Sequence, residues 1–383
     1  MAALTSSWSA IRIGGSTIAD ICLVIAAAIA VLLIGVRHLR MKFWMFGPLV
    51  FGLLLMARDV ILLDRPLNGS DDETLGISPL QMFLRVSLST FGVAAAVSIA
   101  GYIGRRSLIR LLWTWVAGIA VSAVWALAQG QGIVAPTLDL LQLNGAFRYA
   151  GLTSHPNALA QSLVLSIPVL FLGPVRSHRF ASLIRPLLLL LWGFALWQTG
   201  SRAGLLVGFL AVVVCAAAVA ARSGALKWAL PIVLAGVVAA VFVGPRVIAG
   251  TRFAVDSGAS ASDVSRAAAL SDGWTDFLSS PLIGAGFGIW VGELAPLVML
   301  VSGGATFLVV YSIFAFKPLL AMRDNLGDSA VLCCLIAGAL VPVLGLLNNG
   351  FTERYTFWPA LIGFALSAAG MRLRIYGEDS RIG

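Results

Sequence analysis

The sequence predicts an all-α, polytopic integral membrane protein, and three observations point to that fold class. Hydrophobic residues make up 59% of the 383 residues, and charged residues only 11%. The mean hydropathy of +0.95 indicates more apolar surface than a soluble domain can bury. The apolar residues also lie in runs, and a helix satisfies its own backbone groups in lipid. We therefore expect one transmembrane domain over residues 1–383, with about 11 or 12 spans.

The apolar runs define the individual spans, because about 20 helical residues cross a bilayer. The stretch from Pro186 to Ala221 is too long for one span, so we expect two helices joined at "QTGSRAG", where Gly200 and Gly204 allow a turn. The expected spans are residues 17–36, 43–57, 79–103, 111–128, 157–174, 186–199, 203–221, 228–244, 294–316, 329–347 and 355–371.

Charge divides the connections between spans into two sets. Short connections such as "RHLRMK" and "RSHRFASLIR" are basic, and all the lysines lie in this set. The positive-inside rule places them in the cytoplasm, with the N-terminus outside and the C-terminus inside. This orientation also explains the net charge of +9, so no nucleic acid partner is expected. The longer, more acidic connections should face outward.

The largest outward connection spans residues 245–293. Within it we expect an amphipathic helix at about 262–278, capped by Ser262 or Asp263 and lying on the outer face of the bilayer. Its apolar face would carry Leu270, Trp274, Phe277 and Leu278.

No motif indicates a cofactor or a metal. The cysteines lie in apolar runs without C-x-x-C spacing, which is typical of small core residues. "GAGFG" at 284–288 is not a dinucleotide-binding motif, and the sequence contains neither a Walker lysine motif nor H-E-x-x-H.

Arginines near the outer ends of the spans are the first candidates for chemistry. Arg202 stands alone in its apolar stretch, and a guanidinium at the centre of a bilayer costs roughly 2.5 kcal/mol or more. Arg148 and Arg354 occupy similar positions and have no carboxylate three or four residues away on the same helix face. We expect them to bind an anionic ligand such as a diphosphate. Snorkelling or a structural ion pair is the alternative. Arg58 and Arg65 share a loop with acidic residues and are expected to be solvated.

A few other polar residues lie close to the same helix ends. His155 precedes a helix beginning at Pro156, and a hydrogen-bonded structural role is favoured there over that of a base. Asn349 and Glu353 lie in "LLNNGFTER". Glu353 is a candidate general base, or the counter-ion of an arginine.

Three stretches together resemble the O-antigen ligase and O-antigen polymerase family of bacterial membrane glycosyltransferases. They are "FRYAGLTSHPNALAQ", "TGSRAG" and "SRAAALSDGWTDFLSSPLIGAGFG", in that order within residues 140–370. The resemblance implies a GT-C-like fold in the bacterial inner membrane. It also implies transfer of glycans from an undecaprenyl-diphosphate-linked donor at the periplasmic face, without a metal or a nucleotide sugar. It points to Arg148, Asn157, Arg202 and Arg266 as site residues.

The sequence departs from the ligases of this family in one place. Where they carry a histidine-asparagine pair after the glycine-rich turn, this chain has Gly292 and Glu293. Glu293 is therefore a second base candidate, with Glu353, and the departure favours a polymerase of O-antigen or exopolysaccharide. The expected partners are the lipid-linked donor, a glycan or lipid-linked acceptor, and membrane lipids. A ligase using a lipid A-core acceptor, a flippase for lipid-linked glycans and a non-catalytic scaffold remain alternatives.

Overall fold

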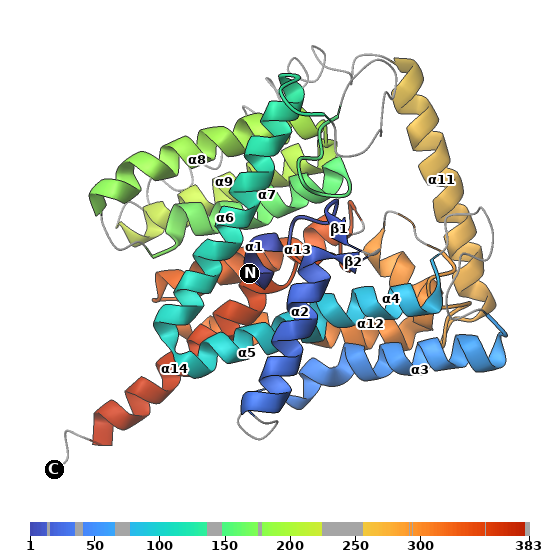
Figure 1. Ribbon diagram of the computed structural model, residues 1–383, viewed down its shortest axis with the longest axis horizontal. Coiled ribbons are helices and arrows are strands. Elements are labelled where there is room, and N and C mark those ends of the chain that lie inside the picture. Colours follow the sequence, from blue (N-terminus) through green and yellow to red (C-terminus); the bar gives the residue numbers. More distant parts are fainter. Residues whose placement is uncertain are drawn as a thin grey trace.

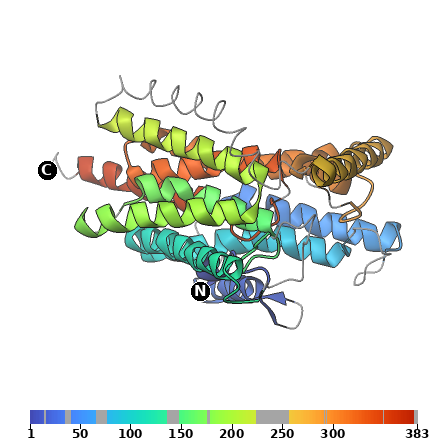
Figure 2. The same ribbon diagram turned by 90° about the horizontal axis from the view of Figure 1, so that it is seen from above.

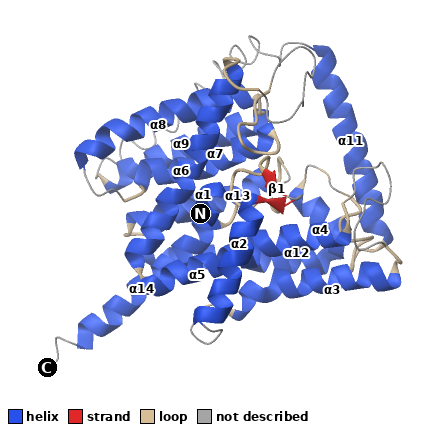
Figure 3. Ribbon diagram, in the orientation of Figure 1, coloured by secondary structure: helices blue, strands red, loops and turns tan. Residues whose placement is uncertain are grey.

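The computed structural model describes residues 1–13, 16–34, 41–65, 77–135, 148–174, 178–223, 256–290, 292, 294–348 and 350–379. Helices account for 77% of it. Strands among the described residues are limited to β1 (Arg12–Ile13) and β2 (Ser16–Thr17), which pair antiparallel and are shown in red in Figure 3. The predicted all-α class is confirmed.

The helices follow one another with short connections. They are α1 (Ala2–Thr5), α2 (Ile18–Ile29, extended by a π-turn over Ala30–Ile34), α3 (Gly47–Leu62, after a 3-10 turn over Phe43–Phe46), α4 (Pro79–Ser87), α5 (Val93–Ile103, joined to α4 by a π-turn over Leu88–Gly92), α6 (Arg105–Gly130), α7 (Pro156–Leu172), α8 (His178–Thr199), α9 (Arg202–Arg222), α11 (Asp256–Ser279), α12 (Ala295–Met322, followed by a 3-10 turn over Arg323–Asn325), α13 (Ser329–Gly345) and α14 (Trp358–Asp379).

Several of these helices can cross a bilayer. Five segments are long and apolar enough to do so: Phe43–Leu62, Pro79–Ile103, Arg105–Gly130, Arg202–Arg222 and Ala295–Asn325. Five shorter apolar helices coincide with further expected spans. The remaining expected span, 228–244, lies outside the described residues. The chain is therefore a multi-pass helical membrane protein.

Helix α7 forms the centre of the bundle. Almost all of its side chains are buried, and it packs against α6, α8, α9 and α13 (Figure 1). A helix that is apolar on every side is stable only where neighbours surround it. This explains why α7 carries no charged residue along its length. Whatever stands at its first turn is consequently held by the most rigid part of the molecule.

The connections gather at two ends of the bundle. At one end Arg105 forms an ion pair with Asp328 (2.7 Å), and Arg222 donates a hydrogen bond to the Leu326 carbonyl (2.6 Å). We call this the basic end; the last turns of α14 lie on the same side. The opposite, or site, end carries the connections expected to face outward (Figures 1 and 2).

Helix α11 lies across the site end rather than along the bundle (Figures 1 and 2). It begins at Asp256, so the expected cap at Ser262 or Asp263 is wrong. Gly273 faces the bundle, since a Cβ there would lie 2.8 Å from the Trp290 ring. The side chains of Leu270, Trp274 and Leu278 remain 36%, 52% and 59% exposed, respectively.

The segment after α11 is hydrogen-bonded to a break in α12. The backbone of α12 leaves helical geometry at Gly303 and Gly304. There the Val301 carbonyl accepts a hydrogen bond from Ala285 N (2.8 Å), and Ala305 N donates to the Pro281 carbonyl (2.9 Å). Gly284 has φ +75°, and a Cβ at this position would lie 2.5 Å from Gly303 N. The glycines of "PLIGAGFG" therefore permit a close backbone approach.

A buried carboxylate clamps this segment to the end of α3. Asp59 is fully buried and pairs with Arg58 (2.6 Å) and Arg65 (2.8 Å). It also accepts the Phe287 N–H (2.5 Å), while Arg65 donates to the Phe287 carbonyl (2.8 Å) and Arg58 to the Ile283 carbonyl. The expectation that Arg58 and Arg65 are solvated is wrong, because both side chains are only about one-seventh exposed.

Candidate anion-binding site

The α8–α9 turn places Arg202 at the site end. Gly200 adopts φ +56°, a left-handed conformation that favours glycine. Ser201 then caps α9, and its Oγ accepts the Gly204 N–H (3.2 Å). Arg202 is the first residue of α9 and is exposed. The predicted division of the long apolar stretch at this turn is confirmed.

Arg148 connects this turn to the start of α7. Its Nε donates to the Thr199 carbonyl (2.9 Å), and its Nη2 donates to Asn157 Oδ1 (2.6 Å). Its side chain also lies against Gly200, where a Cβ would be 3.6 Å from Arg148 Cγ. The two residues that the family resemblance singled out in "FRYAGLTSHPN" are thus in direct contact, beside the turn that carries Arg202.

His155 caps α7 within this group. Its Nδ1 accepts the Asn157 N–H (3.1 Å), so the proton of the neutral ring is assigned to Nε2. Partial burial, together with the charges of Arg148 and Arg266, lowers the pKa of His155 to about 4. The imidazole is therefore neutral at pH 7, and its acceptor nitrogen already serves the helix. This geometry fits a structural role better than that of a general base.

Arg266 approaches the same group from α11. It is exposed on that helix, and its charge acts on His155 together with that of Arg148. Side chains from α7, α11, the segment before α7 and the α8–α9 turn thus converge at the site end. We call Arg148, His155, Asn157, Arg202 and Arg266 the arginine cluster.

Arg354 belongs to a different group. Its Nε and Nη2 lie 2.5 and 2.9 Å from the two carboxylate oxygens of Asp20, which stands in the first turn of α2. The side chain is about one-tenth exposed. The expectation that Arg354 lacks a matching carboxylate is therefore wrong. This bidentate pair ties the α13–α14 connection to α2 and makes Arg354 a positioning residue.

Glu353 lies next to this pair but makes no such contact. Its Oε2 is buried and has no hydrogen-bond partner within the described part of the chain. The charge of Arg85 in α4 interacts with Glu353, Asp20 and Arg354. A carboxylate oxygen without a partner, near a guanidinium, is free to accept a proton or a hydrogen bond from a bound molecule.

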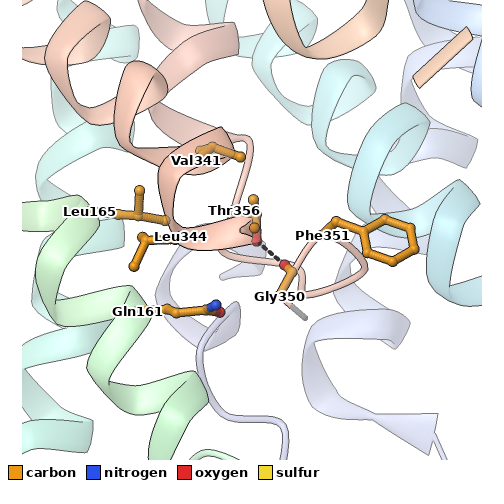
Figure 4. Close-up of a pocket in the computed structure, with 8 residues that line it drawn as sticks. Gln161, Leu165, Val341, Leu344, Gly350, Phe351 and Thr356 are labelled. Atoms are coloured by element: carbon orange, nitrogen blue, oxygen red, sulfur yellow. Dashed lines mark hydrogen bonds between the residues drawn. The ribbon is translucent and has the colours of Figure 1, made fainter. Parts of the chain in front are cut away.

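Gln161 connects the two groups through α7. It lies one turn after Asn157 on the same helix face, and its Oε1 accepts a 2.8 Å hydrogen bond from the Tyr355 hydroxyl. It also lines a small cavity with Gly350, Phe351 and Thr356 (Figure 4). The cavity volume of about 20 Å³ suits one water molecule and no substrate. Any substrate must therefore bind nearer the open end of the bundle.

Sequence reasoning missed Gln161, Tyr355, Asp20 and Arg85 as members of the site end. The spacing from Asn157 to Gln161 on one helix face is a signal that could have identified Gln161. The other two predicted site residues, Glu293 and Asn349, lie outside the described residues. Among the described residues, no group of three or more His, Cys, Asp or Glu side chains could hold a metal ion.

Neither models of known protein families nor curated proteins gave a match to this chain.

Proposed function

We propose that the protein is a glycosyltransferase of the bacterial inner membrane, similar to O-antigen polymerases and ligases. It would transfer glycans from an undecaprenyl-diphosphate-linked donor at the periplasmic face, in the biosynthesis of a surface polysaccharide. The observation that carries the proposal is the arginine cluster, in which Arg148 and Arg266 both act on a neutral His155 beside the turn that carries Arg202.

The electrostatics of the cluster favour a diphosphate. Guanidinium groups from different elements lie close enough that their charge, with burial, keeps an imidazole deprotonated. A dianionic or trianionic group would relieve this accumulation of positive charge, and arginine binds phosphate oxygens in a two-pronged manner. Preorganised charge of this kind stabilises a leaving group most where water is scarce.

Glu353 is the base that the geometry supports. In the proposed step, the acceptor hydroxyl oxygen forms a bond to the anomeric carbon while the bond from that carbon to the diphosphate oxygen breaks. The hydroxyl proton passes to Glu353, and the negative charge passes to the diphosphate, held by the arginine cluster. Through the Asp20 pair, Arg354 would hold the Glu353 segment in place.

A polymerase is favoured over a ligase by Glu293, which stands where ligases carry their histidine-asparagine pair. Transport of a lipid-linked glycan is less favoured because it needs charges along a path through the membrane. Arg85 is the most internal candidate, and it lies only six residues after the start of α4, about 9 Å along the axis. It also interacts with residues of the site end.

Reconstitution tests the proposal directly. Purified protein in liposomes would be given an undecaprenyl-diphosphate-linked oligosaccharide, and the products would be separated by glycan length. Longer glycans on the carrier would support a polymerase. Transfer only after lipid A-core is added would support a ligase. Movement of the donor across the bilayer without a new glycosidic bond would contradict the proposal.

Arg148→Gln provides the matched loss of function in that assay, with Arg323→Gln as the control. Arg323 lies at the basic end and is about three-quarters exposed, so removing its charge should leave transfer unchanged. Equal transfer by wild type and Arg148→Gln would remove the arginine cluster from the mechanism.

A further inference from the structure

A groove on α6 lies at the basic end, opposite the candidate site. It has a volume of about 730 Å³ and is lined by Arg106, Ile109, Arg110, Trp113, Thr114, Ala117 and Pro174. Such a volume is in the range of about 300–1,000 Å³ typical of small-molecule sites. Apart from Pro174, the lining residues recur every three or four positions and so form one face of α6. We call this surface the α6 groove.

Arg106 and Arg110 are one turn apart and both exposed. Within the described part of the chain, neither guanidinium forms an ion pair or donates a hydrogen bond. Their neighbours at this end differ. Arg105 pairs with Asp328, Arg185 donates to the Gly173 carbonyl, and Arg222 donates to the Leu326 and Gly327 carbonyls.

The other polar groups of the groove are already occupied. Trp113 Nε1 donates to the Pro174 carbonyl (2.8 Å), which fixes the indole ring. The Thr114 hydroxyl donates to the Arg110 carbonyl (2.8 Å). The guanidinium groups are thus the donors that a ligand would meet, and the remaining wall is apolar. A ligand that fits carries an anionic head and a hydrocarbon body.

We propose that the α6 groove binds an anionic phospholipid from the leaflet at the basic end, with Arg106 and Arg110 holding its phosphate. Arg105–Gly130 is long and apolar enough to span the bilayer, so its first turns lie at headgroup level. Trp113, one to two turns further along, lies where tryptophan prefers the membrane interface. Ile109 and Ala117 continue the groove as an apolar surface for the acyl chains.

The test compares lipid retention by native mass spectrometry. Wild-type protein extracted from phosphatidylglycerol bilayers should keep bound lipid, and protein from phosphatidylcholine bilayers should not. A basic residue near an anionic lipid surface contributes roughly a fivefold preference, so Arg106→Gln/Arg110→Gln should lower the preference for phosphatidylglycerol by roughly 10- to 30-fold. Arg323→Gln removes a charge at the same end but outside the groove, and should retain lipid like wild type.

Two further measurements make the outcome decisive. Lipid retention by wild type should fall as salt rises, because exposed charges are screened; this holds even if the double variant fails to fold. Glycerol 3-phosphate, which supplies the phosphate without acyl chains, should not displace the lipid at millimolar concentration. Equal retention by the double variant and wild type, salt-independent retention, or displacement by glycerol 3-phosphate would overturn the proposal.

Discussion

Arg148 donates a 2.6 Å hydrogen bond from Nη2 to Oδ1 of Asn157, and so aims a cation at the first turn of the most buried helix of the bundle. Charge-assisted hydrogen bonds of this kind fix both direction and position. The guanidinium is thereby held beside the α8–α9 turn, to which it also donates at Thr199.

Asn157→Asp tests whether this cation serves a ligand. The substitution keeps the shape and the hydrogen bond but adds a negative charge beside Arg148. We expect the melting temperature to be retained and the affinity for undecaprenyl diphosphate to fall about 10-fold or more, since the new carboxylate competes with the diphosphate. Asn157→Ala is the companion variant, because it removes the hydrogen bond without adding charge. Unchanged affinity in Asn157→Asp would contradict the site.

Arg202→Ala should separate function from folding. Arg202 is exposed, so we expect a small change in stability, within roughly 0.5 kcal/mol. Transfer should fall about 100-fold, a typical loss when one charge-stabilising group is removed. Arg202→Lys should recover only part of it, since lysine lacks the planar fork. Melting temperature and transfer rate would be measured on the same samples. A loss of stability with no loss of rate per folded molecule would mean that Arg202 is structural.

Glu353→Gln addresses the base. Glutamine keeps the size of the side chain but cannot accept the acceptor's proton, so turnover should fall about 100-fold or more while donor binding is retained. Asp20→Asn is a useful comparison, because it weakens the Arg354 pair without touching the base. If Glu353→Gln keeps full turnover, proton removal falls to another group.

His155 predicts a particular pH dependence of stability. Its pKa of about 4 lies below the usual 6.5, so the unfolded chain takes up the proton first as the pH falls. The neutral ring therefore contributes its full stability above about pH 6.5, and this contribution, at most about 3 kcal/mol, is lost between pH 6.5 and 4. His155→Asn keeps a good helix cap without the titration. Its melting temperature should decline less over that window. Parallel pH curves for the two proteins would refute the assignment.

Asp59→Asn should destabilise the protein strongly. The buried carboxylate neutralises Arg58 and Arg65 and accepts the Phe287 N–H. Breaking one partner of a buried ion pair costs about 3–5 kcal/mol. Asp324→Asn is the matched control, since that carboxylate is about two-thirds exposed and its ion pair with Arg323 is long, at 3.4 Å. Similar melting temperatures for the two variants would show that the clamp contributes little.

Hydropathy predicted most of the fold because the bilayer imposes a local rule on sequence. A segment must be apolar and helical to cross, whatever its neighbours are. The helix across the site end was also anticipated, but not its start or its orientation. Gly273 rather than the apolar residues faces the bundle, and no periodicity of α11 alone indicates which face a neighbouring helix will cover.

The site was predicted less completely because its contacts join distant segments. Arg148 and Asn157 lie nine residues apart and were found together. Asp20 and Arg354 are 334 residues apart, and nothing in either local sequence names the other as a partner. Asp59 did offer a signal: a carboxylate between arginines at the end of an apolar helix costs too much unless it is paired.

The Asp59 clamp has a consequence for the order of synthesis. Asp59 and Phe287 are 228 residues apart, so at roughly 5–20 residues per second the carboxylate waits about 10 to 45 s for its last partner. During that interval α3 must already be stable in the membrane. Arg58 and Arg65 emerge within a few residues of Asp59 and can neutralise it at once. The nascent chain thus has a local counter-ion before the distant segment arrives.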